Sequence, residues 1–261
     1  MFLYQFLNTI KTKQDNISFF IKGQSYSYKQ LYMAIASVKE SIDNLNLNAI
    51  QKNIAIVCID DFYTYASLFA IWFSGKSYVP LSFHNPTDRN ISILEDANCP
   101  AIISTIELTN QAYNSYKVIK PLHIVSNKEL VVPVVDENEN AYILFTSGST
   151  GLPKGVPISY GNINSFAINF ANSPFRVLET DRCLQMFELT FDVSISSYLS
   201  ALLVGASVYT VPNEGLKYIN VLKLMQDHKL TSIQIVPSII RLGKSFLSKM
   251  SFPDLRNCIL T

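Results

Sequence analysis

The stretch AYILFTSGSTGLPKGVPIS, residues 141–159, decides how the chain is interpreted. Its apolar start and its apolar end are each typical of a β-strand, and a segment rich in glycine and hydroxyl side chains joins them. The chain has only 9 glycines in 261 residues, and three of them lie at positions 148, 151 and 155. Successive backbone N–H groups in such a turn, with hydroxyls and a lysine beside them, form a site that suits a phosphate group.

Two better-known phosphate-binding motifs do not match this stretch. The spacing of G-x-x-x-x-G-K-[ST] is absent, because Gly148 and Gly151 are three positions apart and Lys154 is followed by Gly155. The dinucleotide-binding fingerprint G-x-G-x-x-G does not occur either. A flexible surface loop therefore competes with phosphate binding as an interpretation of the composition alone.

The overall composition indicates a globular protein with a large core. Of the 261 residues, 48% are hydrophobic and only 16% are charged, and the length suits one large domain or two small ones. The net charge is +1 and the basic residues do not cluster, so we expect no nucleic-acid partner. No apolar run is long enough to span a membrane, no secretory leader begins the chain, and the 4 cysteines are widely scattered. We therefore expect a cytoplasmic protein with no membrane association and no zinc site.

Helix-like and strand-like segments alternate along the chain. Helical periodicity predicts helices at residues 27–45, 62–73, 87–97, 162–171, 193–204, 218–228 and 238–249. Short apolar runs predict strands at residues 53–59, 77–81, 100–105, 123–126, 130–135, 182–187, 207–211, 232–236 and 255–261. Ser27 and Gln30 have the spacing of a capping box at the start of the first helix. This alternation predicts an α/β fold with parallel sheets and helices on both faces, in two lobes that meet near residues 135–180.

The segment YILFTSGSTGLPKGV, residues 142–156, closely resembles the signature of the adenylate-forming (AMP-binding) superfamily, which includes acyl-CoA synthetases, luciferases and amino-acid-activating domains. The resemblance implies two stacked parallel-sheet lobes, forming an incomplete N-terminal domain of such an enzyme. It implies an enzyme that joins a carboxylic acid to ATP, with Mg²⁺, and then passes the acyl group to a thiol. It also implies that the ATP phosphates are held by Thr146, Ser147, Gly148, Ser149, Thr150, Gly151 and Lys154.

A second segment, FDVS at residues 191–194, resembles the part of the family that walls the acyl pocket. The resemblance places Phe191 against the substrate and pairs Asp192 with the ammonium group of an amino acid, since an unpaired charge in an apolar pocket is costly. Asp192 also suits the N-cap of the helix that follows, and the two roles are compatible. The aspartate therefore favours an amino acid as the activated acid.

A third segment, IVPS at residues 235–238, resembles the turn that closes the same pocket and places Pro237 and Ser238 near the substrate. The FDVS and VPS segments together resemble both the D-alanine carrier-protein ligases and the adenylation domains of nonribosomal peptide synthetases. The sequence does not decide between them. The acceptor thiol implied by these families is the phosphopantetheine of a carrier protein or coenzyme A.

The resemblance covers nearly the whole chain but only the first half of the family pattern. The downstream YGxTE and TGD motifs are missing, as is the C-terminal lid domain with its lysine. We therefore expect residues 1–261 to be the N-terminal portion of an adenylation domain that holds no clear catalytic residue and is inactive alone. Two alternatives remain: an acyl-CoA synthetase for another carboxylic acid, and a truncated, non-catalytic nucleotide-binding module.

Overall fold

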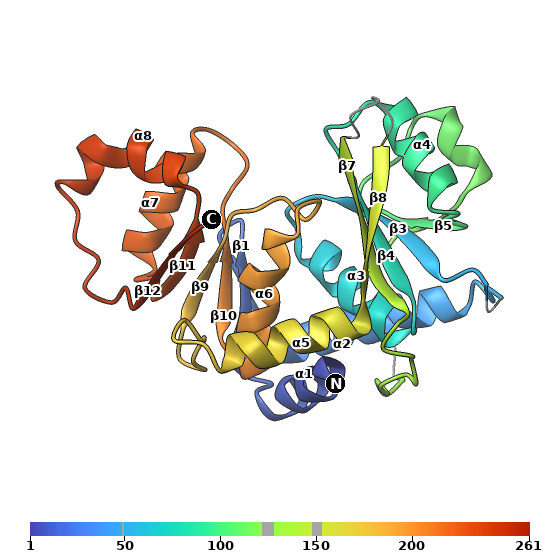
Figure 1. Cartoon of the computed structure of the whole chain (residues 1–261), viewed down its shortest axis with the longest axis horizontal. Coiled ribbons are helices and arrows are strands. Elements are labelled where there is room, and N and C mark those ends of the chain that lie inside the picture. Colours follow the sequence, from blue (N-terminus) through green and yellow to red (C-terminus); the bar gives the residue numbers. More distant parts are fainter. Residues whose placement is uncertain (49, 122–127, 148–152) are drawn as a thin grey trace. The chain divides into compact units, whose positions relative to one another are not determined.

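Two β-sheets organise the chain, and each belongs to its own structural unit (Figure 1). The structure is a computed structural model and describes residues 1–48, 50–121, 128–147 and 153–261. Unit 1 comprises Met1–Leu7 and Leu31–Phe166, and unit 2 comprises Asn8–Gln30 and Ala167–Thr261. Each unit is therefore built from two separate stretches of sequence. The expected meeting of two subdomains near residues 135–180 stays a prediction.

Among the described residues, unit 1 contains a six-stranded sheet in the order β6-β5-β3-β4-β7-β8. Its strands are β3 (Asn53–Cys58), β4 (Ser77–Ser82), β5 (Ala101–Ile103), β6 (Lys117–Ile119), β7 (Asn140–Ser147) and β8 (Pro153–Ser159). All neighbours pair in parallel except β8, which is antiparallel to β7. The helical elements are α2 (Tyr28–Asp43), α3 (Phe62–Phe73), α4 (Thr87–Asp96) and the 3-10 helix η1 (Gln111–Ser115). The helices α1 (Phe2–Thr12) and α5 (Tyr160–Ala171) pass from one unit into the other, and the first three residues of α2 also belong to unit 2.

The described part of unit 2 contains a second six-stranded sheet, in the order β12-β11-β9-β10-β1-β2. Its strands are β1 (Ile17–Ile21), β2 (Gln24–Ser27), β9 (Arg182–Gln185), β10 (Ser207–Thr210), β11 (Ser232–Ile235) and β12 (Asn257–Leu260). Only β2 runs antiparallel, against β1. The helices are α6 (Val193–Val204), α7 (Lys217–Asp227) and α8 (Pro237–Leu247).

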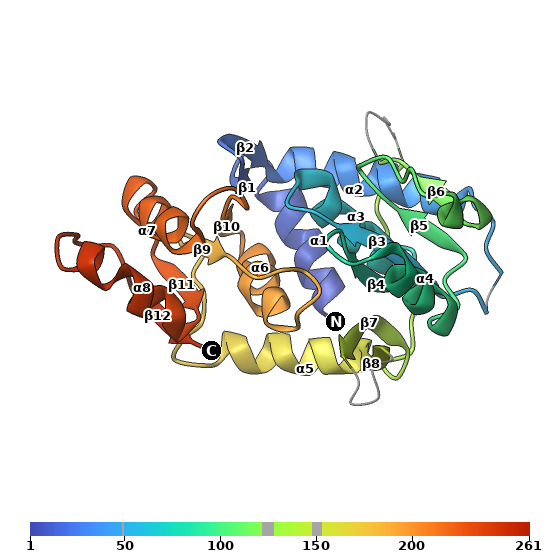
Figure 2. The same cartoon turned by 90° about the horizontal axis from the view of Figure 1, so that it is seen from above.

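Helices cover both faces of the unit 1 sheet (Figures 1 and 2). Val57 of β3 packs with Ile93 of α4 in one hydrophobic cluster. The alternate residues Ile54 and Ile56 of β3 are equally buried, and β3 is also in contact with α3. Because successive strand residues point to opposite faces, α3 and α4 must cover different faces of the sheet.

The unit 2 sheet is covered in the same way. Leu184 of β9 and Ile233 of β11 pack with Val221 of α7 in a second hydrophobic cluster. On the opposite face, α6 contacts β9 and β10, and Cys183 is buried there. Figure 1 shows α7 and α8 on one side of these strands and α6 on the other.

The predicted α/β class is confirmed, but the sheets are mixed rather than parallel throughout. Each of the two antiparallel pairs is joined by a short connection, whereas a parallel pair needs a crossover of about a dozen residues. Residues 148–152 join β7 to β8, and Lys22 and Gly23 join β1 to β2. Lys22 and Gly23 have φ values of 49° and 81°, which are typical of the type I′ turn of a two-residue hairpin.

Some predicted elements differ from the structure. The expected strand at 130–135 is absent: Leu130 is buried, Val134 is fully exposed, and Pro133 cannot donate a ladder hydrogen bond. The expected strand at 123–126 lies outside the described residues. The helix α1 and the strands β1, β2 and β6 were not predicted. Within the described ranges, no helix combines the length and the hydropathy that a bilayer-spanning segment needs.

Candidate nucleotide and substrate site

The glycine- and serine-rich stretch joins the two strands of a β-hairpin. Thr146 of β7 is paired with Lys154 of β8 in the antiparallel ladder, and Ser147 is paired with Pro153. The side chains of Thr146 and Lys154 are exposed, and Thr146 Oγ1 donates a long hydrogen bond of 3.5 Å to the Lys154 carbonyl. The four predicted phosphate-binding residues between them, Gly148, Ser149, Thr150 and Gly151, lie outside the described residues. The structure therefore places Thr146, Ser147 and Lys154 at the end of the hairpin where the connection joins its two strands.

This end of the hairpin is also the carboxyl edge of the parallel strands in unit 1. Tyr78 of β4 pairs with Tyr142 of β7 in parallel register. From this pair both strands run to their carboxyl ends, which are Ser82 in β4 and Ser147 in β7. Open α/β sheets bind their ligands outside the carboxyl ends of the strands, so Thr146 lies at the edge where a ligand is expected.

Gly155, a further glycine of the same motif, has a packing role. A Cβ atom added at this position would lie 3.1 Å from Cζ of Phe145 and 3.2 Å from Cγ2 of Ile143. Gly155 is the cross-strand partner of Phe145, so the missing side chain leaves room for the phenyl ring. This glycine is explained by the fit of the hairpin and needs no contact with an anion.

Asp192 caps helix α6, as the alternative interpretation of this residue predicted. Its Oδ1 accepts a hydrogen bond of 2.8 Å from the Val193 N–H, and the side chain is exposed. Within the described residues, the other carboxylate oxygen accepts no hydrogen bond. Phe191, immediately before the cap, is 60% exposed. Because one oxygen forms the helix cap and the other accepts no hydrogen bond in the described part of the chain, the Asp192 carboxylate can also pair with the cationic group of a ligand.

Pro237 and Ser238 begin helix α8 directly after strand β11. Pro237 is the first residue of the helix, a position that favours proline because its N–H would have no helical partner. Pro237 is exposed and Ser238 is half-buried. Because β9 and β11 are parallel, the segments that follow them leave the same edge of the unit 2 sheet. The structure thus brings Phe191, Asp192, Pro237 and Ser238 to one carboxyl edge.

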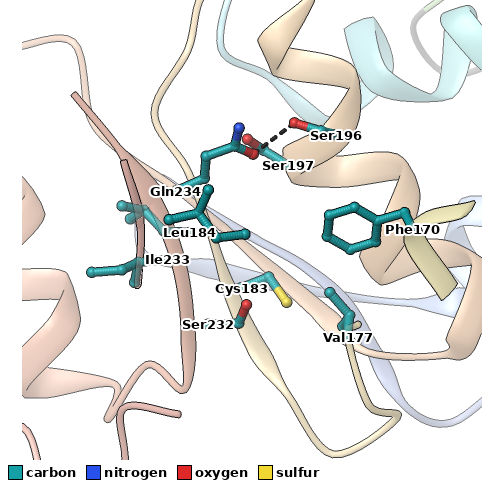
Figure 3. Close-up of a pocket in the computed structure, with 10 residues that line it drawn as sticks. Phe170, Val177, Cys183, Leu184, Ser196, Ser197, Ser232, Ile233 and Gln234 are labelled. Atoms are coloured by element: carbon teal, nitrogen blue, oxygen red, sulfur yellow. Dashed lines mark hydrogen bonds between the residues drawn. The ribbon is translucent and has the colours of Figure 1, made fainter. Parts of the chain in front are cut away.

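A small pocket opens beside α6 in unit 2, and its polar residues were not predicted from the sequence (Figure 3). Ser196 Oγ lies 2.6 Å from Gln234 Oε1, which joins α6 to β11 across the pocket. The free volume is ≈ 20 Å³, about the space of one water molecule. The lining residues are Phe170, Val177, Cys183, Leu184, Ser196, Ser197, Ser232, Ile233, Gln234 and Ile259. Two sequence features could have marked these residues individually, although not their contact: Ser196 follows Asp192 by one helical turn, and Gln234 is a polar residue inside an apolar strand.

Residues 6–256 match the family described as AMP-binding enzyme. The chain belongs to this family. The resemblance seen in residues 142–156 is therefore confirmed, and the match extends over almost the whole AMP-binding chain.

Two curated relatives and two solved structures illustrate the similarity. The D-alanine–D-alanyl carrier protein ligase of Lactococcus lactis subsp. lactis (strain IL1403) is 31% identical over 222 residues, which are 81% of this chain and 43% of the ligase. A linear gramicidin synthase of Brevibacillus parabrevis is 30% identical over 194 residues, 72% of this chain and 2% of the synthase. The Vibrio cholerae adenylation domain AlmE, in complex with glycyl-adenosine-5'-phosphate, has a TM-score of 0.80 and 23% identity over 97% of this chain and 53% of its own. The o-succinylbenzoate coenzyme A synthetase MenE of Bacillus subtilis, in complex with AMP, has a TM-score of 0.82 and 19% identity over 98% of this chain and 67% of its own.

The AMP-binding chain spans less than half the length of the curated ligase that it matches. The solved structures, at these identities, support the fold. The fold shared with AlmE and MenE is an α/β arrangement of two mixed sheets with helices, as described above.

The pocket of this AMP-binding chain is uncharged. None of its lining residues is acidic or basic. Burial, and secondarily the negative charge of Asp181, raise the pKa of the Cys183 thiol well above its usual value, so that the thiol stays protonated. The pocket therefore offers hydroxyls and one carboxamide to a ligand, against apolar walls.

The described residues also offer no metal site of their own. No three histidine, cysteine, aspartate or glutamate side chains among them come together as ligands of a metal ion. Thr146 and Lys154 supply a hydroxyl and a cation, and neither is the carboxylate that Mg²⁺ prefers. These residues do not form a Mg²⁺ site.

Proposed function

We propose that the protein containing this chain activates an amino acid with ATP, forming an aminoacyl adenylate and pyrophosphate, and transfers the acyl group to a thiol. The observation that carries this proposal is the Asp192 carboxylate, which is exposed at the carboxyl edge of unit 2 with one oxygen unpaired within the described residues. A carboxylate in this position suits the α-ammonium group of an amino acid. Fatty and aryl acids have no such group.

In the first step, a carboxylate oxygen of the amino acid attacks the α-phosphorus of ATP, and the bond to the pyrophosphate oxygen breaks. The attack brings negative charge toward a triphosphate, so donors and cations are needed around the phosphates. We assign this role to Thr146, Ser147 and Lys154 and to Gly148, Ser149, Thr150 and Gly151. The exposed positions of Thr146 and Lys154 at the carboxyl edge support the assignment. FmoA3, a solved relative with the same fold, was obtained in an AMPPNP-bound form.

Mg²⁺ enters this proposal only as the counter-ion that ATP carries with it. The described residues form no Mg²⁺ site, so no step is assigned to the ion. In the second step, the thiol sulfur attacks the acyl carbon and AMP leaves. We propose the phosphopantetheine of a carrier protein as the thiol, because the ligase relative is named for its carrier protein. Coenzyme A, which appears in the name of MenE, is the alternative.

The test is ATP–pyrophosphate exchange by the gene product that carries this chain, over a panel of L- and D-amino acids with fatty and aryl acids beside them. Exchange that depends on an amino acid is the expected result. Exchange with fatty or aryl acids alone would leave Asp192 as a helix cap and favour an acyl-CoA synthetase. Exchange with no acid would favour a non-catalytic nucleotide-binding module.

A further inference from the structure

We infer that the Lys76 side chain is a site of covalent modification, which accepts an acyl group from mixed anhydrides of a carboxylic acid and a phosphate. Acyl phosphates and acyl adenylates both belong to this class of donor. Lys76 directly precedes β4, so it lies at the amino ends of the parallel strands β3 and β4, whereas Thr146 lies at the carboxyl edge. The site is therefore separate from the candidate nucleotide site, and the inference does not depend on the proposed function.

Lys76 is held in place at both ends of its side chain. Its backbone N–H donates to the Ile71 carbonyl of α3 at 3.1 Å, and its backbone carbonyl accepts from the Tyr160 hydroxyl at 2.8 Å. The amine at the other end donates to the Gln51 carbonyl at 3.0 Å. The amine therefore has a defined position, and the side chain is half-buried rather than enclosed, so a small donor can reach it.

The amine belongs to a cluster of charged side chains, and the carboxylates of this cluster are paired with other lysines. Asp43 of α2 pairs with Lys39 at 2.7 Å, and Glu139 forms an ion pair with Lys52. Lys76 forms no ion pair with any residue that the structure describes, and its amine contacts a neutral carbonyl instead. A carboxylate partner would favour the protonated amine, so its absence makes the proton of Lys76 easier to remove.

The surroundings of Lys76 favour the neutral, nucleophilic form of the amine. Burial lowers the pKa of Lys76 from its ordinary value of 10.5, the negative charge of Asp43 partly opposes this, and the positive charge of Lys52 adds to it. Only an unprotonated amine has a lone pair with which to attack. A larger fraction of Lys76 than of an exposed lysine is therefore reactive near neutral pH.

The acyl transfer is a single substitution. The Lys76 nitrogen attacks the carbonyl carbon of the anhydride, and the bond from that carbon to the bridging phosphate oxygen breaks. Phosphate or AMP leaves with the electron pair, the nitrogen loses one proton to water, and an amide remains. The step needs no oxidant, no reductant and no reactant other than the donor.

The test treats the gene product that carries this chain with acetyl phosphate at pH 8 and follows each lysine by mass spectrometry of its peptides. We expect Lys76 to be acetylated about 10-fold faster than Lys223, an exposed lysine of α7. The ratio should fall as the pH is raised to 10, because the exposed amine then loses its proton as well. In the chain unfolded by guanidinium chloride the two lysines should react equally.

Two variants of the charged cluster should change the rate in opposite directions. Lys52→Gln removes the neighbouring positive charge and should slow the acetylation of Lys76 by about 3-fold. Asp43→Asn removes the opposing negative charge and should speed it by about 3-fold. Asp88→Asn, at an exposed position of α4 outside the cluster, is the matched control and should leave the rate unchanged.

A rate for Lys76 no higher than that of Lys223 would overturn the inference, and so would equal rates in the two charge variants. Acetyl phosphate reacts without ATP, so neither result bears on the proposed function. A second sample, with ATP and an amino acid in place of acetyl phosphate, identifies the donor. Aminoacyl groups on Lys76 in that sample support the site with the protein's own adenylate as donor, and their absence beside acetylation supports it with acyl phosphates as donors.

Discussion

Asp192 combines a structural contact and a proposed recognition contact in one side chain, and the two can be separated. The residue caps α6 through Oδ1, which accepts from the Val193 N–H. Asparagine caps helices about as well as aspartate, but it carries no charge. A change to asparagine therefore tests the charge while keeping the cap.

For Asp192→Asn we expect kcat/KM for the amino acid to fall by about 100-fold, because the ammonium group loses its carboxylate partner. ATP–pyrophosphate exchange by the gene product measures the loss. The melting temperature should stay within about 2 °C of the wild type, since the helix keeps its cap. Full activity in this variant would show that Asp192 is only a cap.

The close packing of Gly155 against Phe145 predicts how one added methyl group changes the stability of the chain. Gly155→Ala places a methyl group 3.1 Å from the ring of Phe145, so the ring must move. We expect the free energy of unfolding to fall by about 1 to 2 kcal/mol, measured by urea denaturation. The double change Gly155→Ala with Phe145→Leu is the control. If the ring is the obstacle, the alanine should cost less in the leucine background, and equal costs in both would contradict this explanation.

At the scale of elements, local patterns predicted the helices well. Helices α3 and α6 have the predicted bounds of 62–73 and 193–204, because each is a mainly apolar segment followed by a glycine, with φ values of 65° at Gly75 and 90° at Gly205. The capping box at Ser27 and Gln30 is confirmed. The Ser27 N–H donates to Gln30 Oε1 at 2.8 Å, and the Gln30 N–H donates to Ser27 Oγ at 3.2 Å.

We predict that Ser27→Ala lowers the free energy of unfolding by about 1 kcal/mol, because the Gln30 N–H loses its acceptor at the first turn of α2. Chemical denaturation followed by circular dichroism is the measurement. Ser25→Ala, in the same strand β2 and exposed, is the control and should be nearly neutral. A similar loss in both variants would mean that strand β2, and not the cap, is affected.

Elements that depend on distant partners were harder to predict. Strand β1 pairs with β10, which is far away in the sequence, and strand β6 has only 3 residues. The run at 130–135 has the apolar composition of a strand, yet the Leu130 N–H donates to the Tyr32 hydroxyl of α2 at 3.0 Å instead of to a neighbouring strand. The apolar composition of this run therefore indicated neither strand pairing nor uniform burial, since Val131 and Val134 are exposed.

In the candidate site, too, the local motifs were predicted from the sequence and the contact between distant residues was not. Asp192 and the IVPS turn were predicted because they are local motifs, although their roles stay predictions. The contact of Ser196 with Gln234 joins residues 38 positions apart. No local pattern contains it, because it exists only when α6 packs across β9 onto β11.

At the scale of the whole molecule, one buried carboxylate ties three strands of unit 2 together. Asp181 precedes β9 and accepts hydrogen bonds from Leu178 N–H at 2.7 Å and from Thr231 Oγ1 at 2.6 Å. It also forms an ion pair with Arg256, and the side chain of Asp181 is 4% exposed. Thr231 precedes β11 and Arg256 precedes β12. The network therefore joins the amino ends of these strands.

This network predicts a stability change in acid. Burial alone would raise the pKa of Asp181, but the hydrogen bonds from Arg256, Leu178 and Thr231 outweigh it, and the pKa lies below its ordinary value of 3.8. Since the folded pKa is the lower one, the contribution to stability is complete above the ordinary value and is lost as the pH falls through the folded pKa. Melting temperatures between pH 2 and pH 7 should show this loss.

Asp181→Asn should lower the free energy of unfolding by about 3 kcal/mol at pH 7, because Arg256 loses its partner. The variant should also lose less of its melting temperature than the wild type when the pH is lowered from 7 to 2. Asp227→Asn, at an exposed position of α7, is the control, and its melting temperature should fall in acid as much as that of the wild type. If the melting temperature of Asp181→Asn falls in acid as much as that of the wild type, Asp181 is not the cause of the loss of stability in acid.

The sheet of unit 2 is assembled from the two ends of the chain, and this has a consequence during translation. Phe19 of β1 pairs with Val208 of β10, and the whole of Leu31–Phe166 belongs to unit 1 and separates them. At ribosomal speeds of 5–20 residues per second, β1 emerges roughly 10 to 40 s before its partner. Unit 1 can close in that interval, while the apolar strand β1 is paired with β2 alone and its other edge is exposed to chaperones. A chain whose synthesis ends before residue 208 would therefore have one finished sheet and an uncovered β1–β2 hairpin.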